Sequence, residues 1–460
     1  MHLHKLSRGN FRAFKFVSFL LVAAIAAGCG GAIESEMKAP VSVAVAAPIA
    51  KSLTVPPNTT PPPTPPAVSL PTTPPVAVLP SSPVMPTTSA PITINNGKLK
   101  IFILAGQSNM VGFGKTDRGG DPDRATIQCP LRADGTRGYP ANILGGMGSL
   151  RAMVNANPSK YSYLVDPAKT ISYKVDADYY GCVKADTKTY SGWAKRDNVY
   201  VVSLDVQPLN SDTVTRSGKL TVGFGSGTNR DLEIGEGYIG PEFGFGHAVG
   251  SGLEDKVLLI KTSWGGKSLA VDFRPPSSVG LGVGFPSTTS AETPDVTGAY
   301  YIEMVRKVKL VLSDIKKYYP DYDGNGYEVI GLGWHQGWND RVNYKLGYVA
   351  QYETNMVNLI QDLRKDLNLP NLLVAVGNTG LADADKDING LNLINAQGNV
   401  SDPIKYPKFA GNVITVDTRP FHYPNTSPEI GFIHHWNYSG ESYFKVGESM
   451  GVAMLKLMRS

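Results

Sequence analysis

"KLKIFILAGQSNMVG", residues 98–112, is the stretch of the sequence that indicates the fold class most clearly. Its first seven residues form a short apolar run that leads into a glycine turn, a pattern typical of a buried β-strand. Four further stretches have the same character: residues 256–262, 328–334, 372–377 and 412–417.

Helical patterns lie between these runs. Apolar residues recur at helical spacing in residues 301–315 and 352–363, and a last helix is expected over residues 439–458. Strands that alternate with helices predict an α/β fold, in which a parallel sheet is covered on both faces. Residues 115–235 are rich in Gly, Asp and Tyr and lack clear periodicity, so we expect a long insertion there.

The N-terminus has the pattern of a secretion signal. Basic residues precede an apolar run, residues 16–27, that is too short to span a bilayer. It ends in Ala26-Ala27-Gly28-Cys29, which resembles a bacterial lipobox, where the cysteine thiol takes a lipid. We expect residues 1–28 to be a lipoprotein signal peptide and Cys29 to anchor the chain in the bacterial cell envelope, at the outer membrane or the cell surface. Plain secretion is the alternative.

Residues 29–94 are expected to form a stalk. From residue 38 onward they are rich in Pro, Thr, Ser, Val and Ala. Proline removes backbone donors and favours extended polyproline II, so this stretch cannot build a packed core. At about 3.1 Å per residue, it would hold the folded domain, residues 95–460, clear of a membrane.

Charge and cysteines exclude some functions. A net charge of +5, without a run of Lys and Arg, does not predict nucleic-acid binding. Outside the cytoplasm the pair Cys129 and Cys182 predicts a disulfide, with two free thiols as the alternative. We interpret "DYDGNGYE", residues 321–328, as an Asp/Gly turn, because an EF-hand needs Glu where Leu332 stands. We expect neither a metal nor a cofactor.

Two strand ends offer the parts of a nucleophilic site, because ligands of parallel sheets bind where strands end. Ser108 lies in a Gly-flanked turn before a helix-like stretch, which places a hydroxyl beside backbone N–H groups. After the strand at residues 256–262, "WGGKSL" brings Gly266, whose small size lets its N–H approach a substrate oxygen. An ordinary turn is the alternative at each place.

The third strand end is "LGWHQGWND", residues 332–340. Its polar residues are Gln336, Asn339 and Asp340. Trp334 and Trp338 beside them are candidates for stacking on sugar rings, although a buried core position is the commoner role of tryptophan.

Two histidines, His434 and His435, directly precede the last predicted helix. A lone histidine is usually structural. A histidine at the last strand–helix junction, in a chain that already offers an activated-serine turn, is a candidate general base.

Taken together, these segments resemble the SGNH hydrolase superfamily, and more closely carbohydrate esterase family 6 and the sialate O-acetylesterase-like domain. The matching blocks, in family order, are "GQSNM", "WGGKSL", "WHQGWND" and "HHWNYSGESY", and "IGPEFGFG" at residues 239–246 also looks like family sequence. The resemblance covers roughly residues 97–458. It implies a flavodoxin-like three-layer sandwich and a serine esterase.

The resemblance also implies roles for single residues. Ser108 would be the nucleophile, and its N–H, that of Gly266 and the Gln336 side chain would form the oxyanion hole. Asn339 is a rival to Gln336, because residues 337–340 fit the superfamily's general G-x-N-D pattern. His435 would be the base, because "HWNY" fits the family's His-aromatic-Asn pattern better than a register that starts at His434.

The acid of the triad departs from the family pattern. Phe432 stands where the superfamily often has Asp, and Trp338 stands where the family often has Glu. Asp340 is our first choice because it lies inside a recognised block, although it could instead brace its loop. Glu429, or a dyad in which a backbone carbonyl or water orients the base, are the alternatives.

The function expected from these blocks is removal of acetyl groups from carbohydrate, either polysaccharide or sialic acid. An esterase on other small acyl esters and a non-catalytic glycan-binding surface protein are the alternatives. Which glycan is the substrate stays open at this point.

Lipidation of Cys29 is directly testable. Metabolic labelling with a palmitate analogue should mark the wild-type protein in membranes and leave Cys29→Ser unlabelled, because the substitution removes the acceptor thiol. An unlabelled wild-type protein recovered from the medium would instead indicate plain secretion.

Overall fold

The computed structural model describes residues 96–116, 148–175, 186–205, 209–226, 237–280, 298–380, 387–422 and 433–460. The predictions for the signal peptide, Cys29, the stalk, the Cys129–Cys182 pair and Glu429 therefore lie outside the described residues.

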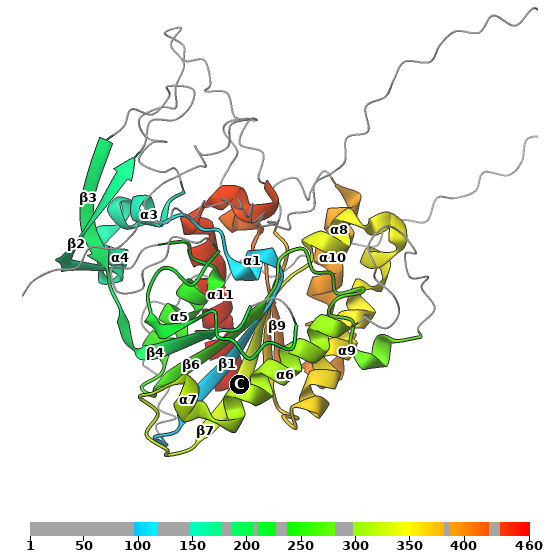
Figure 1. The fold of residues 1–460 in the computed structure, drawn as a ribbon. Coiled ribbons are helices and arrows are strands. Elements are labelled where there is room, and N and C mark those ends of the chain that lie inside the picture. Colours follow the sequence, from blue (N-terminus) through cyan, green and yellow to red (C-terminus); the bar gives the residue numbers. More distant parts are fainter. Residues whose placement is uncertain are drawn as a thin grey trace, which may run out of the picture. The chain divides into compact units, whose positions relative to one another are not determined.

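A seven-stranded sheet forms the centre of the folded domain (Figure 1). In sheet order its strands are β5 (Arg216–Leu220), β4 (Arg196–Ser203), β6 (Val257–Ser263), β1 (Leu99–Gly106), β7 (Tyr327–His335), β8 (Leu373–Gly377) and β9 (Val413–Val416). Every neighbouring pair is parallel except β4 and the edge strand β5. The five apolar runs of the sequence became β1, β6, β7, β8 and β9, which confirms the α/β prediction.

These five strands lie in the order β6-β1-β7-β8-β9. Numbered along the chain, this is the 2-1-3-4-5 order of flavodoxin-like folds. Of these strands, β6 lies on one side of β1, and β7, β8 and β9, which come later in the chain, lie on the other side. The topological switch point therefore lies between β1 and β7. Ligands of such sheets bind beyond the carboxyl ends of the strands at this point.

Helices cover both faces of the sheet (Figure 1). On one face, α5 (Pro241–Gly252) and α11 (Gly440–Arg459) pack over Phe102 and Leu104 of β1. On the other face, α6 (Ala299–Ser313), α9 (Tyr348–Asp366) and α10 (Ile388–Asn399) pack over Ile101 and Ile103. Successive side chains of a strand point to opposite faces, so β1 is buried on both sides and the predicted three-layer sandwich is confirmed.

Shorter elements complete the domain. The α-helices are α1 (Ser108–Val111), α3 (Leu150–Ala156), α4 (Pro158–Tyr161), α7 (Ile315–Tyr318) and α8 (Trp338–Val342). The 3-10 helices are η1 (Ser162–Leu164), η2 (Pro276–Ser278), η4 (Tyr344–Leu346), η5 (Pro407–Phe409), η6 (Arg419–Phe421) and η7 (Ile433–Tyr438). The strands β2 (Val165–Val175) and β3 (Asp186–Trp193) form a separate antiparallel hairpin.

Part of the expected insertion belongs to the central sheet. Residues 115–235 contain the hairpin, but they also supply β4, which pairs in parallel with β6, and β5, which pairs with β4. The sequence pattern did not predict β4, because the first half of this strand is polar and partly exposed. In its second half Val199, Val201 and Val202 are buried. Tertiary pairing with β6 supplies the context that this short run lacks alone.

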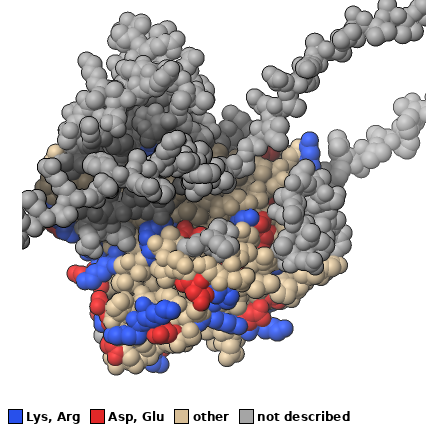
Figure 2. All heavy atoms as spheres, in the orientation of Figure 1, with Lys and Arg blue, Asp and Glu red and all other residues tan. Residues whose placement is uncertain are grey.

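The surface carries both signs of charge. Figure 2 shows Lys and Arg side chains interspersed with Asp and Glu among the described residues of the face in view. None of the helices in the described ranges is long and apolar enough to cross a membrane.

Candidate active site

Three predicted loops start at the same level of the sheet. Gly106 at the end of β1 pairs with Ser263 of β6 on one side and with His335 of β7 on the other. Because these strands are parallel, the chain leaves all three at one edge. The turn of Ser108, the loop of Gly266 and the loop of Gln336 therefore begin side by side at the switch point.

Ser108 is the first residue of α1, directly after the turn that ends β1. Its backbone N–H has no partner inside the helix, as is general for first-turn residues. The turn is tight because Gly106 has φ 155°, and a Cβ there would collide with the carbonyl of His335. The side chain is mostly buried, with 7% of the residue exposed.

The side chain of Gln107 ties this turn to the loop after β7. Its Oε1 accepts hydrogen bonds from the backbone N–H groups of Gly337 and Asn339, both at 3.1 Å. Its Nε2 lies 3.5 Å from Ser108 Oγ. The residue before the candidate nucleophile thus fixes the loop that carries the candidate oxyanion donors. The sequence pattern did not indicate that Gln107 bonds to this loop, although Gln107 lies in the quoted turn.

The two candidate oxyanion donors differ in how many of their amide protons are already hydrogen-bonded. Gln336 is 1% exposed, and its Nε2 donates to Asp340 Oδ2 at 2.5 Å and to the carbonyl of Lys267 at 3.0 Å. An amide nitrogen has only two protons, so this group is already occupied. Asn339 is half-buried and gives one Nδ2 proton to the carbonyl of Gly266 at 2.8 Å, which leaves its second proton for a substrate oxygen.

Asp340 braces the loops. Its two carboxylate oxygens accept the backbone N–H groups of Leu269 and Ala270, each at 2.9 Å, besides the amide of Gln336. Among the described residues its hydrogen-bond donors are these two N–H groups and the Gln336 amide, so Asp340 has the contacts of the bracing role that was the alternative, and its role as the acid of the triad stays a prediction. Burial raises the pKa of Asp340 to about 7, although the three donors oppose that rise.

The histidine loop is attached to both ends of α1. Asn109 Nδ2 donates to the carbonyl of His434 at 3.0 Å, and Tyr443 OH of α11 donates to Asn109 Oδ1 at 2.9 Å. Just after α1, the ring of Phe113 stacks on His435, with centroids 4.2 Å apart and planes 10° apart. Both histidines are half-buried. No pattern in the sequence indicated the roles of Asn109 and Phe113.

The backbone of this loop adopts an unusual conformation. Trp436, Asn437 and Tyr438 have φ values of 53°, 51° and 57°, the left-handed region that non-glycine residues rarely occupy. Such residues cost free energy and cluster at functional sites, where the surrounding structure holds them. Trp436 is fully buried and supplies part of that support.

The two tryptophans predicted to bind sugar have different positions. Trp334 is fully buried, and its Nε1 donates to Tyr352 OH at 3.2 Å, so its ring is core and is not available to a sugar. Its position in β7 points it into the face covered by α6 and α9. Trp338 is half-buried at the start of α8, with its ring stacked on His434 and the guanidinium of Arg341 4.5 Å from its centroid. Trp338 therefore borders the site, and Trp334 does not.

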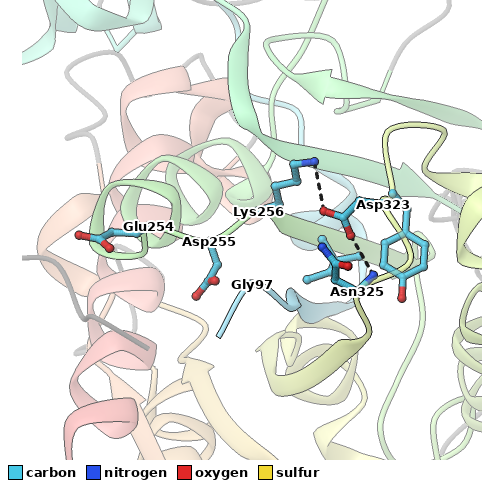
Figure 3. Close-up of a pocket in the computed structure, with 8 residues that line it drawn as sticks. Gly97, Glu254, Asp255, Lys256, Asp323 and Asn325 are labelled. Carbon is cyan, nitrogen blue, oxygen red and sulfur yellow. Dashed lines mark hydrogen bonds and ion pairs between the residues drawn. The ribbon is translucent and has the colours of Figure 1, made fainter. Parts of the chain in front are cut away.

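A cavity of about 220 Å³ lies at the opposite edge of the sheet (Figure 3). It opens where β1 and β6 begin, and its lining includes Asp255, Lys256, Asp323 and Asn325. Lys256 Nζ lies 3.6 Å from Asp323 Oδ2, and the Asn325 N–H donates to Asp323 Oδ1 at 3.0 Å. Because parallel sheets bind substrates at their carboxyl edge, this cavity is not a candidate for the reaction site.

Comparison with known proteins gives one family match. A model of the family described as "Carbohydrate esterase, sialic acid-specific acetylesterase" matches residues 206–455. Among curated proteins, no sequence matches the chain.

Three similar solved structures have low sequence identity to the chain. A protein from Arabidopsis thaliana is 16% identical, with a TM-score of 0.38, over 78% of this chain and 98% of that one. A carbohydrate acetylesterase from Xanthomonas citri is 13% identical, with a TM-score of 0.39, over 77% of this chain and 55% of that one. NanS is 12% identical, with a TM-score of 0.33, over 70% of this chain and 78% of that one.

The rival oxyanion donors can be separated by substitution. Asn339→Ala should lower kcat for acetyl-ester hydrolysis by about 100- to 1000-fold with little change in KM, because a donor aimed at the oxyanion acts mainly in the transition state. Gln336→Ala should mainly lower Tm, because its amide holds Asp340. The reverse ranking in kcat would assign the donor role to Gln336.

A bracing Asp340 predicts a change in stability. In Asp340→Asn an amide NH₂ replaces one carboxylate oxygen and faces a backbone donor, so the free energy of unfolding should fall by about 1–3 kcal/mol. Asp362→Asn is a matched control, because Asp362 likewise accepts the N–H and hydroxyl of Ser277, outside the site. A normal Tm with kcat lowered by orders of magnitude would instead identify Asp340 as the triad acid.

Proposed function

Because the chain belongs to the carbohydrate esterase, sialic acid-specific acetylesterase family, it is a carboxylic ester hydrolase, and we propose that it removes O-acetyl groups from carbohydrate through an acetyl-enzyme on Ser108. The family model spans more than half of the chain, which has 460 residues. One observation carries the proposed mechanism: hydrogen bonds join the turn of Ser108 to the loops of Asn339 and His434, and Asn339 is bonded in turn to Gly266.

In the first step Ser108 Oγ attacks the acetyl carbonyl carbon, and His435 takes the hydroxyl proton. The carbonyl π electrons move to the oxygen, which becomes a tetrahedral oxyanion. Proximity of the base is supported by the loop contacts, since Phe113, whose ring stacks on His435, lies two residues beyond the end of α1.

The oxyanion is stabilised by donors that are in place before the reaction. These would be the N–H groups of Ser108 and Gly266 and the Nδ2 of Asn339. Preorganised donors require no reorganisation at the moment of reaction, and a single one is worth about 3–4 kcal/mol in comparable sites. The contact between Asn339 Nδ2 and the carbonyl of Gly266, 2.8 Å long, keeps two of these donors at a fixed separation.

In the second step the imidazolium of His435 returns its proton to the sugar oxygen, and the C–O bond of the ester breaks. The sugar leaves with a free hydroxyl, and Ser108 carries the acetyl group. Water, deprotonated by His435, then attacks this ester, and acetate leaves as the serine hydroxyl is restored.

Orientation of His435 is proposed to come from its packing. The Phe113 ring stacks on the imidazole, and the Tyr438 ring lies 5.9 Å from it, centroid to centroid. Asp340 is bonded to the loop of Leu269 and Ala270 instead. These contacts disfavour a triad that uses Asp340, and Glu429 or a dyad in which a backbone carbonyl or water orients His435 are the alternatives that we propose.

The substrate is proposed to be an acetylated carbohydrate outside the cytoplasm. The family description supports the carbohydrate class. Lipid attachment at Cys29 and the extended stalk would place the domain at the bacterial cell envelope within reach of polymeric glycans. An assay of acetate release from each substrate distinguishes polysaccharide from sialic acid.

Loss of the nucleophile tests the proposed function. Wild-type protein should release acetate from at least one of acetylated xylan, acetylated pectin and O-acetylated sialic acid, and Ser108→Ala should lose that activity while keeping its Tm. Acetate release by Ser108→Ala at the wild-type rate would contradict the serine mechanism. Glycan binding without release by the wild type would favour a non-catalytic binding protein.

Substitution of each histidine tests the identity of the base. His435→Ala should lower kcat by several orders of magnitude, because no other group would accept the Ser108 proton. His434→Ala should be milder, because its contact with Asn109 is made by the backbone carbonyl, which the substitution keeps. A larger loss in His434→Ala would move the base by one residue.

A further inference from the structure

A fully buried ion pair lies behind the nucleophile helix. Lys261 of β6 and Glu242 of α5 are both 0% exposed, and Lys261 Nζ lies 2.7 Å from Glu242 Oε2. Removing two charges from water is costly, so a buried pair of this kind is weak evidence for stability. Neither residue belongs to the proposed reaction chemistry, which raises the question of what the pair does.

The lysine is bonded to the end of α1. Its three ammonium protons have three acceptors: Glu242 Oε2, the carbonyl of Phe224 at 2.9 Å, and the carbonyl of Val111 at 2.8 Å. Val111 is the last residue of the four-residue helix that Ser108 begins. Because every proton is used, the ammonium group has one orientation and holds this carbonyl in place.

The glutamate holds the same helix from a second side. Its Oε1 accepts the N–H of Gly240 at 2.8 Å. Gly240 packs so closely on α1 that a Cβ added there would come within 2.9 Å of the carbonyl of Met110. This explains "IGPE", residues 239–242, a family-like motif to which the proposed mechanism gives no role.

We propose that the Glu242–Lys261 pair is a positioning element for Ser108, which sets the place of α1 and thereby of the nucleophile. A helix of four residues is far too short to be stable by itself, so external bonds must fix it. Hydrogen bonds from a charged group are stronger than neutral ones, which suits this task. The inference rests on the proposed role of Ser108.

The test removes both charges together, because deletion of one partner would leave an unpaired buried charge. In Lys261→Met/Glu242→Gln the glutamine oxygen still accepts the Gly240 N–H, but the bond to the Val111 carbonyl is lost. A misplaced nucleophile should lower kcat for acetyl-ester hydrolysis by about 10- to 100-fold with KM nearly unchanged.

The chain offers a matched control. Lys307 and Glu303 form a second buried pair, 0% and 1% exposed with 3.5 Å between their charged atoms, and Glu303 also accepts hydrogen bonds from the half-buried Arg306 at 2.8 and 2.9 Å. Both lie on α6, on the opposite face of the sheet from α5. Lys307→Met/Glu303→Gln should change Tm by a similar amount and leave kcat within about twofold of the wild type.

The kcat values of the two double variants separate the outcomes. A fall in kcat confined to the 261/242 variant supports positioning. Wild-type kcat in that variant, or an equal fall in both variants, overturns it. If the double variant does not fold, Lys261→Met alone, which also removes the bond to the Val111 carbonyl, should show the same kcat loss when assayed below its Tm. If Ser108→Ala retains wild-type turnover, the proposed function has failed, and this inference, which rests on it, fails with it. Loss of turnover in Ser108→Ala together with wild-type kcat in the 261/242 variant overturns this inference alone.

Discussion

The side-chain amide of Gln107 is the contact on which the rest of the site depends. Its oxygen accepts two backbone N–H groups from the loop after β7, those of Gly337 and Asn339. Gln107 is buried, so loss of the amide would leave those two donors without a partner, at a cost of about 1–3 kcal/mol each. The residue also directly precedes Ser108. One side chain therefore sets the distance between the proposed nucleophile and the candidate oxyanion donor.

The sheet fixes the strand ends, but it does not fix the loops beyond them. Those loops are held by bonds to one another: Asn339 to the carbonyl of Gly266, Asp340 to the N–H groups of Leu269 and Ala270, and Asn109 to the carbonyl of His434. A site built in this way keeps its donors aimed before the substrate arrives, which is the main source of catalysis in oxyanion-stabilising enzymes. The buried Glu242–Lys261 pair extends the same logic behind α1.

Local patterns in the sequence predicted five of the seven strands of the central sheet, because buried runs such as residues 98–104 carry their own signal, but they did not predict β4 and β5. They did not predict what the polar residues bind. Asp340 lies near Gln336 in sequence, but its other partners, Leu269 and Ala270, are 71 and 70 residues away. Gln107 and Gly337 are 230 residues apart. Strand alternation in β7 turns Trp334 into the core, so its ring has the buried role that is commoner for tryptophan.

Covalent trapping with a serine-directed reagent tests directly whether Ser108 is an activated nucleophile. A fluorophosphonate should add its mass to a single peptide, the one that contains Ser108, and heat-unfolded protein should not react, because only the assembled loops activate that hydroxyl. Labelling that is confined to Ser108 and lost in Gln107→Ala would be the predicted result. A label on another residue, or equal labelling of folded and unfolded protein, would contradict a nucleophile preorganised at this switch point.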